Sequence, residues 1–438
     1  MQTNFSETAL ADPAIAASEA IIRKCVHCGF CTATCPTYTL LGDELDSPRG
    51  RIYLIKDMLE NERQPTEKVV KHIDRCLSCL SCMTTCPSGV HYMHLVDQAR
   101  AYIEDNYRRS WWDRTLRGVL AWVLPHHGHF RLALELGQLG RPFAGLFDMA
   151  KATKPLAAML RLVPSRLPAP ASLEAPGVPQ RKGRVALLQG CAEPVLRPEI
   201  REATVRLLTR LGWEVVFARG EQCCGALVHH MGREEASLEA ARRNVDAWMA
   251  EVENEGLDAV LITASGCGTT IKDYGYMLRH DPAYADRAAR VSELALDISQ
   301  FLDRIELPEG RAAGIRVAYH SACSLQHGQK VTADPQRLLA KAGFTVLTPR
   351  NAHLCCGSAG TYNILQPEIA NELGLRKAVS LDETTPDVIA AGNIGCAVQI
   401  SRWAGAPVVH TVQLLDWATG GPLPATLETS PPFKETTR

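Results

Sequence analysis

Residues 25–36, CVHCGFCTATCP, and residues 76–87, CLSCLSCMTTCP, carry the same cysteine spacing. In each stretch three cysteines are separated by two residues, a fourth follows after three more, and a proline closes the motif. At this chain's overall cysteine frequency, one such set is expected on the order of once per 20,000 cysteines. Two copies therefore indicate two dedicated sets of metal ligands.

The spacing is typical of 4Fe-4S clusters. Three thiolates on one short loop bind three irons of a cubane, and the fourth cysteine reaches the other cluster. Zinc knuckles are the alternative, but zinc does not call for the third and fourth cysteines at these offsets or for the proline. We assign the first cluster to Cys25, Cys28, Cys31 and Cys86, and the second to Cys35, Cys76, Cys79 and Cys82.

The segment between the two motifs predicts a helix, so the cluster module is expected to be helical. Ser47 is a favourable N-cap and Pro48 suits the first helical position. Apolar residues then recur at helical spacing, at Ile52, Ile55 and Leu59. Arg49 and Arg51 near the helix start either raise the potential of a cluster, guide a partner, or belong to a solvated helix end.

Length and composition narrow the class of protein. The 438 residues suggest two or three domains, and a formal net charge of -1 gives no reason to expect nucleic acid as a partner. The N-terminus lacks a secretory signal pattern, and no uncharged apolar run reaches the roughly 18 residues of a membrane span. We therefore expect a cytosolic protein, soluble or peripheral, whose 16 cysteines are metal ligands rather than disulfides.

Bulky apolar and basic residues mix in the segment 101–163, which we expect to be a helical connector. Trp111, Trp112 and Trp122 suit an amphipathic helix that docks on a membrane surface or a partner subunit. Such stripes are also common in ordinary cores, so core packing is the alternative interpretation.

Three histidines follow Pro125, and we expect them in a loop: His126, His127 and His129. A stiff proline-rich linker then marks a domain boundary. The predicted division is a helical two-cluster ferredoxin domain (1–100), the connector (101–163), the linker (164–184), and two α/β repeats (185–310 and 311–438).

The repeats are recognised by their alternating pattern. In the first copy the strand-like RVALLQGC precedes a helical stretch, REATVRLLTRLGWEVV, and in the second IRVAYHSAC precedes QRLLAKAGFTV. A further apolar strand follows in each copy, AVLITASGC and DVIAAGNIGC. This alternation predicts parallel sheets with ligands at the carboxyl ends of the strands. The expected fold class is α+β multidomain.

Each copy carries four cysteines, two of them adjacent and followed by glycine. Thirty-one residues separate the first cysteine from this CCG pair in both copies. We expect the eight thiols to converge on crevices as an additional metal, iron-sulfur or redox-active thiol site, the alternative being ordinary packing as small apolar residues. The eight are Cys191, Cys223, Cys224, Cys267, Cys323, Cys355, Cys356 and Cys396.

Neighbouring residues refine this site. Gly225 and Gly357 lack a Cβ and are expected to let the backbone approach a ligand. His320 and His353 flank the cysteines of the second copy. They serve either as ligand or proton donor or as hydrogen-bonded loop residues. Leu188 takes the place of His320 in the first copy.

Several catalytic motifs are missing from the sequence. No G-x-G-x-x-G follows a strand, and no P-loop, G-x-S-x-G or H-E-x-x-H is present. A chain with clusters and no two-electron cofactor needs a flavin-bearing partner for the substrate step. We therefore assign no catalytic residue to this chain.

Over nearly its whole length the sequence resembles the iron-sulfur subunit of glycolate oxidase, a bacterial glycolate dehydrogenase. The resemblance rests on KCVHCGFCTATCPTY, LLGDELDSPRGRIYLIK, DRCLSCLSCMTTCPSGV, TASGCG and HLCCGSAGTYN. It implies FAD-binding partner subunits that oxidise glycolate to glyoxylate, with D-lactate as a further substrate. It also implies electron transfer towards membrane quinone, at the cytoplasmic face of the inner membrane, with the eight N-terminal cysteines as cluster ligands.

The CCG repeats also resemble those of heterodisulfide reductases, which hold a non-cubane cluster and reduce disulfides. There the last cysteine begins a C-x-x-C pair, whereas here Cys267 leads to GTT and Cys396 to AVQ. Each copy thus has four cysteines instead of five. A thiol-disulfide reductase, a sensing iron-sulfur protein and the iron-sulfur subunit of a related lactate or glycerol-3-phosphate dehydrogenase are the alternatives.

Overall fold

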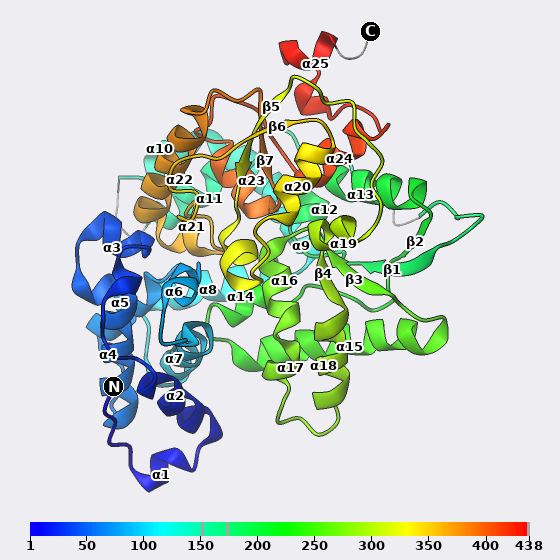
Figure 1. Ribbon diagram of the computed structural model, residues 1–438. Helices are drawn as coiled ribbons and strands as arrows, with labels where there is room; N and C mark the ends of the chain where they lie inside the picture. Colours follow the sequence, from blue (N-terminus) through cyan, green and yellow to red (C-terminus); the bar gives the residue numbers. More distant parts are fainter. Residues whose placement is uncertain (150–152, 172–174, 436–438) are drawn as a thin grey trace.

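The computed structural model describes residues 1–149, 153–171 and 175–435. Figure 1 shows the N-terminal helices grouped on one side of the molecule, beside two α/β units. The mixed helical and sheet architecture confirms the predicted fold class. The domain boundaries stay predictions, and residues 150–152 of the connector, 172–174 of the linker and 436–438 of the second repeat lie outside the described residues.

The N-terminal module is built from short helices around an apolar core. Ser47 caps the fourth helix as expected, because its hydroxyl accepts the Gly50 N–H at 3.0 Å. Ile22, Ile55 and Ile73 are fully buried between the helices. The helices are α1 (Glu7–Leu10), α2 (Pro13–Arg23), α3 (Pro36–Leu41), α4 (Pro48–Glu60), α5 (Glu67–Asp74), α6 (Ser81–Thr85) and α7 (Tyr92–Asn106), with 3₁₀ turns η1 (Phe30–Thr32) and η2 (Glu44–Asp46).

The connector is helical and much of its apolar surface faces outward. Its elements are α8 (Trp111–Val123), α9 (His127–Gly140), η3 (Arg141–Phe143), α10 (Ala144–Phe147) and α11 (Lys154–Leu162). The expectation that the three histidines share a loop is wrong for His127 and His129, which lie in the first turn of α9 after His126 as N-cap. Among the described residues, no helix is long and apolar enough to span a membrane.

The first repeat is a parallel sheet of four strands in the order β2-β1-β3-β4. The strands are β1 (Gly183–Leu187), β2 (Trp213–Val216), β3 (Ala259–Ile262) and β4 (Ala295–Asp297). The helices are α12 (Glu193–Leu196), α13 (Glu199–Arg210), α14 (Ala226–His229), α15 (Glu234–Asn254), α16 (Ser265–Lys272), α17 (Tyr274–Met277), α18 (Ala285–Leu294) and α19 (Ile298–Arg304).

The second repeat has the same strand order, β6-β5-β7-β8, also parallel. Its strands are β5 (Arg316–His320), β6 (Thr345–Leu347), β7 (Val388–Ala391) and β8 (Val408–Val409). Its helical elements are the π-turn η5 (Ser324–Gly328), α20 (Asp334–Lys341), α21 (Tyr362–Leu365), α22 (Pro367–Asp382), α23 (Ile394–Ile400), α24 (Thr411–Ala418), η6 (Ala425–Leu427) and α25 (Pro431–Glu435).

Two predicted helices end earlier than expected. Gly212 and Gly343 have φ of 89° and 96°, a left-handed conformation that ends a helix. The residues after them form β2 and β6, because a run rich in valine and threonine favours a strand. The stretches REATVRLLTRLGWEVV and QRLLAKAGFTV are therefore each a helix followed by a strand.

The repeats share one apolar core, and the N-terminal module docks against both. Core side chains from the two sheets pack together, among them Val185 and Val388. Tyr362 of the second repeat donates its hydroxyl to the carbonyl of Arg75 at 3.0 Å. Gly232 of the first repeat lies so close to the Arg100 carbonyl that a Cβ would be 2.4 Å from that oxygen. The second cysteine motif is thereby held next to the repeats.

Candidate functional site

The first predicted cysteine set lines one cavity at the surface of the N-terminal module. Cys25 lies at the end of α2, and the loop after it carries the rest of the first motif. Cys86, from the second motif, lines the same cavity as Cys25, Cys28 and Cys31. Cys28 is exposed, whereas Cys25 is buried. Cys82, which is assigned to the second set, also lines this cavity, so the crossed assignment of the fourth cysteine stays a prediction.

The second predicted set is buried throughout: Cys35, Cys76, Cys79 and Cys82. Thr37 Oγ1 lies 3.3 Å from the sulfur of Cys35, and the Tyr92 hydroxyl donates to the sulfur of Cys76 at 3.7 Å. Burial, with Cys79 and other thiols nearby, raises the pKa of Cys82 well above its usual value. A metal ion bound among these thiols would favour their ionised form, because the thiolate rather than the thiol is the metal ligand.

A buried ionic network lies behind Cys35. Arg51 is 1% exposed, and its guanidinium reaches the Cys35 sulfur at 3.9 Å and Asp46 at 3.3 Å. The Asp46 carboxylate also accepts from Arg75 at 2.8 Å and contacts His72 at 2.9 Å. The alternative of a solvated helix end is therefore wrong for Arg51. Its positive charge is placed beside the second set and paired by a carboxylate.

Cys79 connects the N-terminal module to the second repeat. It packs in one apolar cluster with Cys355, and Cys323 lies against that cluster. Burial and the neighbouring Cys323 raise the pKa of the Cys79 thiol well above its usual value. The second cysteine set therefore adjoins the thiols of the second repeat.

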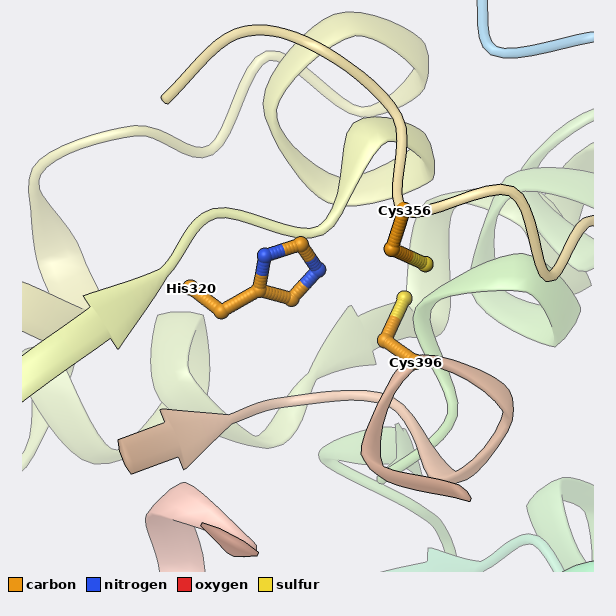
Figure 2. Close-up of side chains that lie close together, drawn as sticks. All are labelled: His320, Cys356 and Cys396. Atoms are coloured by element: carbon orange, nitrogen blue, oxygen red, sulfur yellow. The ribbon is translucent and has the colours of Figure 1, made fainter. Parts of the chain in front are cut away.

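The thiols of the second repeat converge at the carboxyl end of its sheet, as the α/β pattern predicts. Cys323 and Cys355 have sulfurs 3.6 Å apart. Figure 2 shows His320, at the end of β5, with its ring directed toward the sulfurs of Cys356, on the CCG loop, and Cys396, on α23. One ring nitrogen and these two sulfurs lie within 4.8 Å of one another.

The first repeat gathers its own thiols, without a histidine beside them at the end of the strand. The sulfur of Cys223 is in hydrogen-bonding contact with those of Cys191 and Cys224, which together lower the pKa of Cys223. Leu188, in the place of His320, is buried in the apolar core. His127 reaches this site from the connector and contacts the carbonyl of Gly190.

The glycine after each vicinal pair has a backbone role. Gly225 and Gly357 have φ of 83° and 84°, a conformation that disfavours other residues. A Cβ on Gly357 would lie 2.6 Å from the carbonyl of Ala370 in α22. The close approach is to a helix of the same repeat, which differs from the expected approach to a ligand.

A separate cavity of about 290 Å³ lies between α2, α7 and the first repeat. His94 in its wall stacks between His91 and Tyr276, at ring separations of 3.9 and 3.5 Å. Its Nε2 is 2.9 Å from a carboxylate oxygen of Asp273. His91 directly follows Val90, which lines the cavity of the first cysteine set. The His94–Asp273 pair carries no sequence signature and was not predicted, and the sequence did not reveal that His127 contacts the first repeat.

Comparison with known proteins agrees with this arrangement. Residues 21–90 match the 4Fe-4S dicluster domain family, and residues 185–272 and 317–401 each match the cysteine-rich domain family. Fold and sites together define a two-cluster iron-sulfur protein with paired cysteine-rich repeats. The glycolate oxidase iron-sulfur subunit of Escherichia coli K12 is 42% identical over 95% of this chain and 99% of its own length. The chain belongs to the family of glycolate oxidase iron-sulfur subunits.

Other similarities are weaker. The probable glycolate oxidase iron-sulfur subunit of Bacillus subtilis 168 is 32% identical over 91% of this chain and 93% of its own. Lactate utilization protein A of Bacillus licheniformis is 27% identical over 53% of this chain and 99% of its own. A crystal structure of a hypothetical protein from Helicobacter pylori aligns with a TM-score of 0.44 at 11% identity, covering 87% of this chain and 78% of that one.

Proposed function

We propose that this chain is the electron-transfer subunit of a flavin-dependent glycolate dehydrogenase that oxidises glycolate to glyoxylate, with D-lactate as a second substrate. The observation that carries the proposal is the double cysteine motif within a likeness that extends over 95% of the chain to a glycolate oxidase subunit. Each cluster, when bound, accepts and releases one electron at a time. FAD on partner subunits supplies the two-electron step that the chain itself has no motif to perform.

The ligands of the two clusters are the eight assigned N-terminal cysteines. Support for the first set is its shared cavity, which includes Cys86 from the second motif. Support for the second set is that all four thiols are buried, with Arg51 beside Cys35. Among the described residues, neither set contains three sulfurs within 4.8 Å of one another. That wide spacing suits ligands bound to different irons.

Quinone is the proposed acceptor, and the cavity beside His94 is its candidate binding site. Its walls combine apolar side chains such as Ala17 and Ile21 with the His94–Asp273 pair. Reducing a quinone to a quinol takes two electrons and two protons, and a His–Asp pair is suited to deliver protons. The stacked His91 brings this wall close to the first cysteine set.

Peripheral attachment to the cytoplasmic face of the inner membrane is the proposed location. Trp111, Trp112 and Trp122 on α8 are 59%, 63% and 61% exposed. Leu139 of α9 is 75% exposed. Exposed tryptophans at this density are typical of surfaces that contact a membrane interface.

The cysteines of the repeats are proposed as additional metal or iron-sulfur sites. Their convergence in each repeat and the packing of Cys79 against the thiols of the second repeat support this. Thiol-disulfide reduction is the second candidate function, favoured by the 3.6 Å separation of the Cys323 and Cys355 sulfurs. It predicts that the chemically reduced chain alone cleaves a disulfide.

The test is co-purification with the flavin-bearing subunits, followed by glycolate-dependent dye reduction. We expect turnover by the complex, none by this chain alone, and at least about a hundredfold loss when Cys79→Ser removes a cluster ligand. Ser78→Ala is the matched control, since Ser78 neighbours Cys79 but is not a proposed ligand. Full turnover in the Cys79→Ser complex would contradict the proposal.

A further inference from the structure

The imidazole of His320 is buried at the carboxyl end of β5. The side chain is 1% exposed, and neither Nδ1 nor Nε2 has a hydrogen-bond partner within the described parts of the chain. An unpaired buried polar group of this kind costs about 1 to 3 kcal/mol, so native structures rarely keep one without a reason. A metal ion that accepts the lone pair of a ring nitrogen is such a reason.

The groups that His320 faces are soft metal ligands. One of its ring nitrogens lies within 4.8 Å of the sulfurs of Cys356 and Cys396, which also lie within that distance of each other. Figure 2 shows the three side chains pointing toward a common centre from three separate segments. A tetrahedral zinc ion holds such donors roughly 3.5 to 3.8 Å apart, so a small rotation of the side chains closes the site.

The other cysteine sets lack this compact arrangement. In the first repeat Leu188 occupies the place of His320 and packs into the apolar core, so the end of that strand offers no nitrogen donor. The eight N-terminal cysteines form no group of three donors within 4.8 Å among the residues described. Spacing of that kind separates a single-ion site from a site that spans several irons.

We propose that the second repeat binds a single zinc-type divalent ion through His320, Cys356 and Cys396. A sulfur of the adjacent Cys323–Cys355 pair supplies the fourth ligand. This deepens the proposed metal site of the repeats and is independent of the glycolate proposal. Zinc has no redox chemistry, so electrons do not enter the second repeat through this ion. Its role is structural: it fixes the CCG loop against Cys79.

The experiment is elemental analysis and zinc-edge X-ray absorption on the full chain, purified anaerobically, compared with two variants. His320→Leu copies the first repeat, and His353→Leu removes a histidine that also flanks the cysteine pair. We expect about one zinc per chain with mixed sulfur and nitrogen scattering in the unaltered protein. His320→Leu should lose the imidazole signal and most of the zinc, whereas His353→Leu should keep both.

The outcomes separate this site from the proposed clusters. The iron and labile sulfide of the N-terminal sets should be the same in all three proteins, which also shows that the variants fold. Absence of zinc from the unaltered chain, zinc with sulfur ligands only, or iron and sulfide that depend on His320 would each overturn the proposal. Loss of glycolate activity has no bearing on it, because the readout is the metal and its ligands.

Discussion

The guanidinium of Arg51 lies 3.9 Å from the sulfur of Cys35, and both side chains are buried. A cation in a medium of low dielectric stabilises the reduced, more negative form of a nearby cluster. Arg51→Gln should therefore lower the reduction potential of the buried cluster by roughly 50 to 100 mV. A redox titration followed by electron paramagnetic resonance measures this shift.

Arg49 provides the matched comparison for Arg51. It lies two residues away on α4 but lines the cavity of the first cysteine set. Arg49→Gln should shift the potential of the exposed cluster and leave that of the buried cluster unchanged. If the two variants shift the same cluster, the assignment of Cys35 to the second set is wrong.

The crossed ligand sets make a second prediction. Cys86→Ala should abolish the spectrum of the exposed cluster, which shares a cavity with Cys86, and reduce bound iron from about eight to about four per chain. Pro87→Ala, at the neighbouring position, should keep about eight irons. Loss of the buried cluster in Cys86→Ala, with the exposed one retained, would contradict the crossed assignment.

The cavity beside His94 predicts a way to separate quinone reduction from dye reduction. Ala17→Phe places a ring in the cavity and should lower quinone-dependent turnover of the assembled complex about tenfold, without a change in turnover with an artificial dye. Ala16→Phe, on the same helix but outside the cavity lining, is the control. Equal effects of both variants on both acceptors would exclude this cavity as the acceptor site.

The exposed tryptophans predict membrane binding. Replacing Trp112 and Trp122 together with serine should weaken binding to vesicles of phosphatidylethanolamine and phosphatidylglycerol by about tenfold or more, because two large apolar side chains leave the interface. Tyr53→Ser on α4, where the ring is 57% exposed, is the control. Unchanged sedimentation with vesicles would point to a protein partner for this face.

A buried carboxyl group predicts how stability depends on pH. Burial raises the pKa of Asp297, the N-cap of α19, to about 6. The folded state therefore keeps a proton that the unfolded state releases near its ordinary pKa of 3.8, and stability falls as pH rises from about 4 through about 6. Asp297→Asn keeps the cap to Ser299 and removes the charge.

The variant should match the parent near pH 4 and exceed it at pH 8 by on the order of 2 to 3 kcal/mol in the free energy of unfolding. Asp303→Asn, at a surface ion pair with Arg337, should show no such gain. Urea unfolding at the two pH values measures both. A variant less stable than the parent at pH 8 would show that the ionised carboxylate is needed in the fold.

Patterns with a fixed local geometry were predictable from the sequence. Ser47 and Pro48 define the start of α4, and the alternation of apolar and helical stretches predicts parallel sheets with thiols at the strand ends. What escaped prediction depends on long-range packing. The burial of Arg51 arises from Asp46 and from elements that only meet in the folded module.

The same holds between domains. His127 reaches the first repeat from the connector. Cys79 packs near Cys323 of the second repeat, although the two are 244 positions apart in the sequence. No periodicity in the sequence encodes these contacts. Gly212 and Gly343 did carry a readable signal, since a glycine before a valine-rich run commonly ends a helix and begins a strand.

The most direct test of the central claim is the iron, labile sulfide and flavin content of the chain purified anaerobically alone, measured beside glycolate-dependent dye reduction with and without its partner subunits. The account predicts about eight irons and eight sulfides in cubane clusters, no flavin in the lone chain, and turnover only in the assembled complex. Glycolate oxidation by the lone chain, or zinc in place of iron at the N-terminal cysteines, would contradict it.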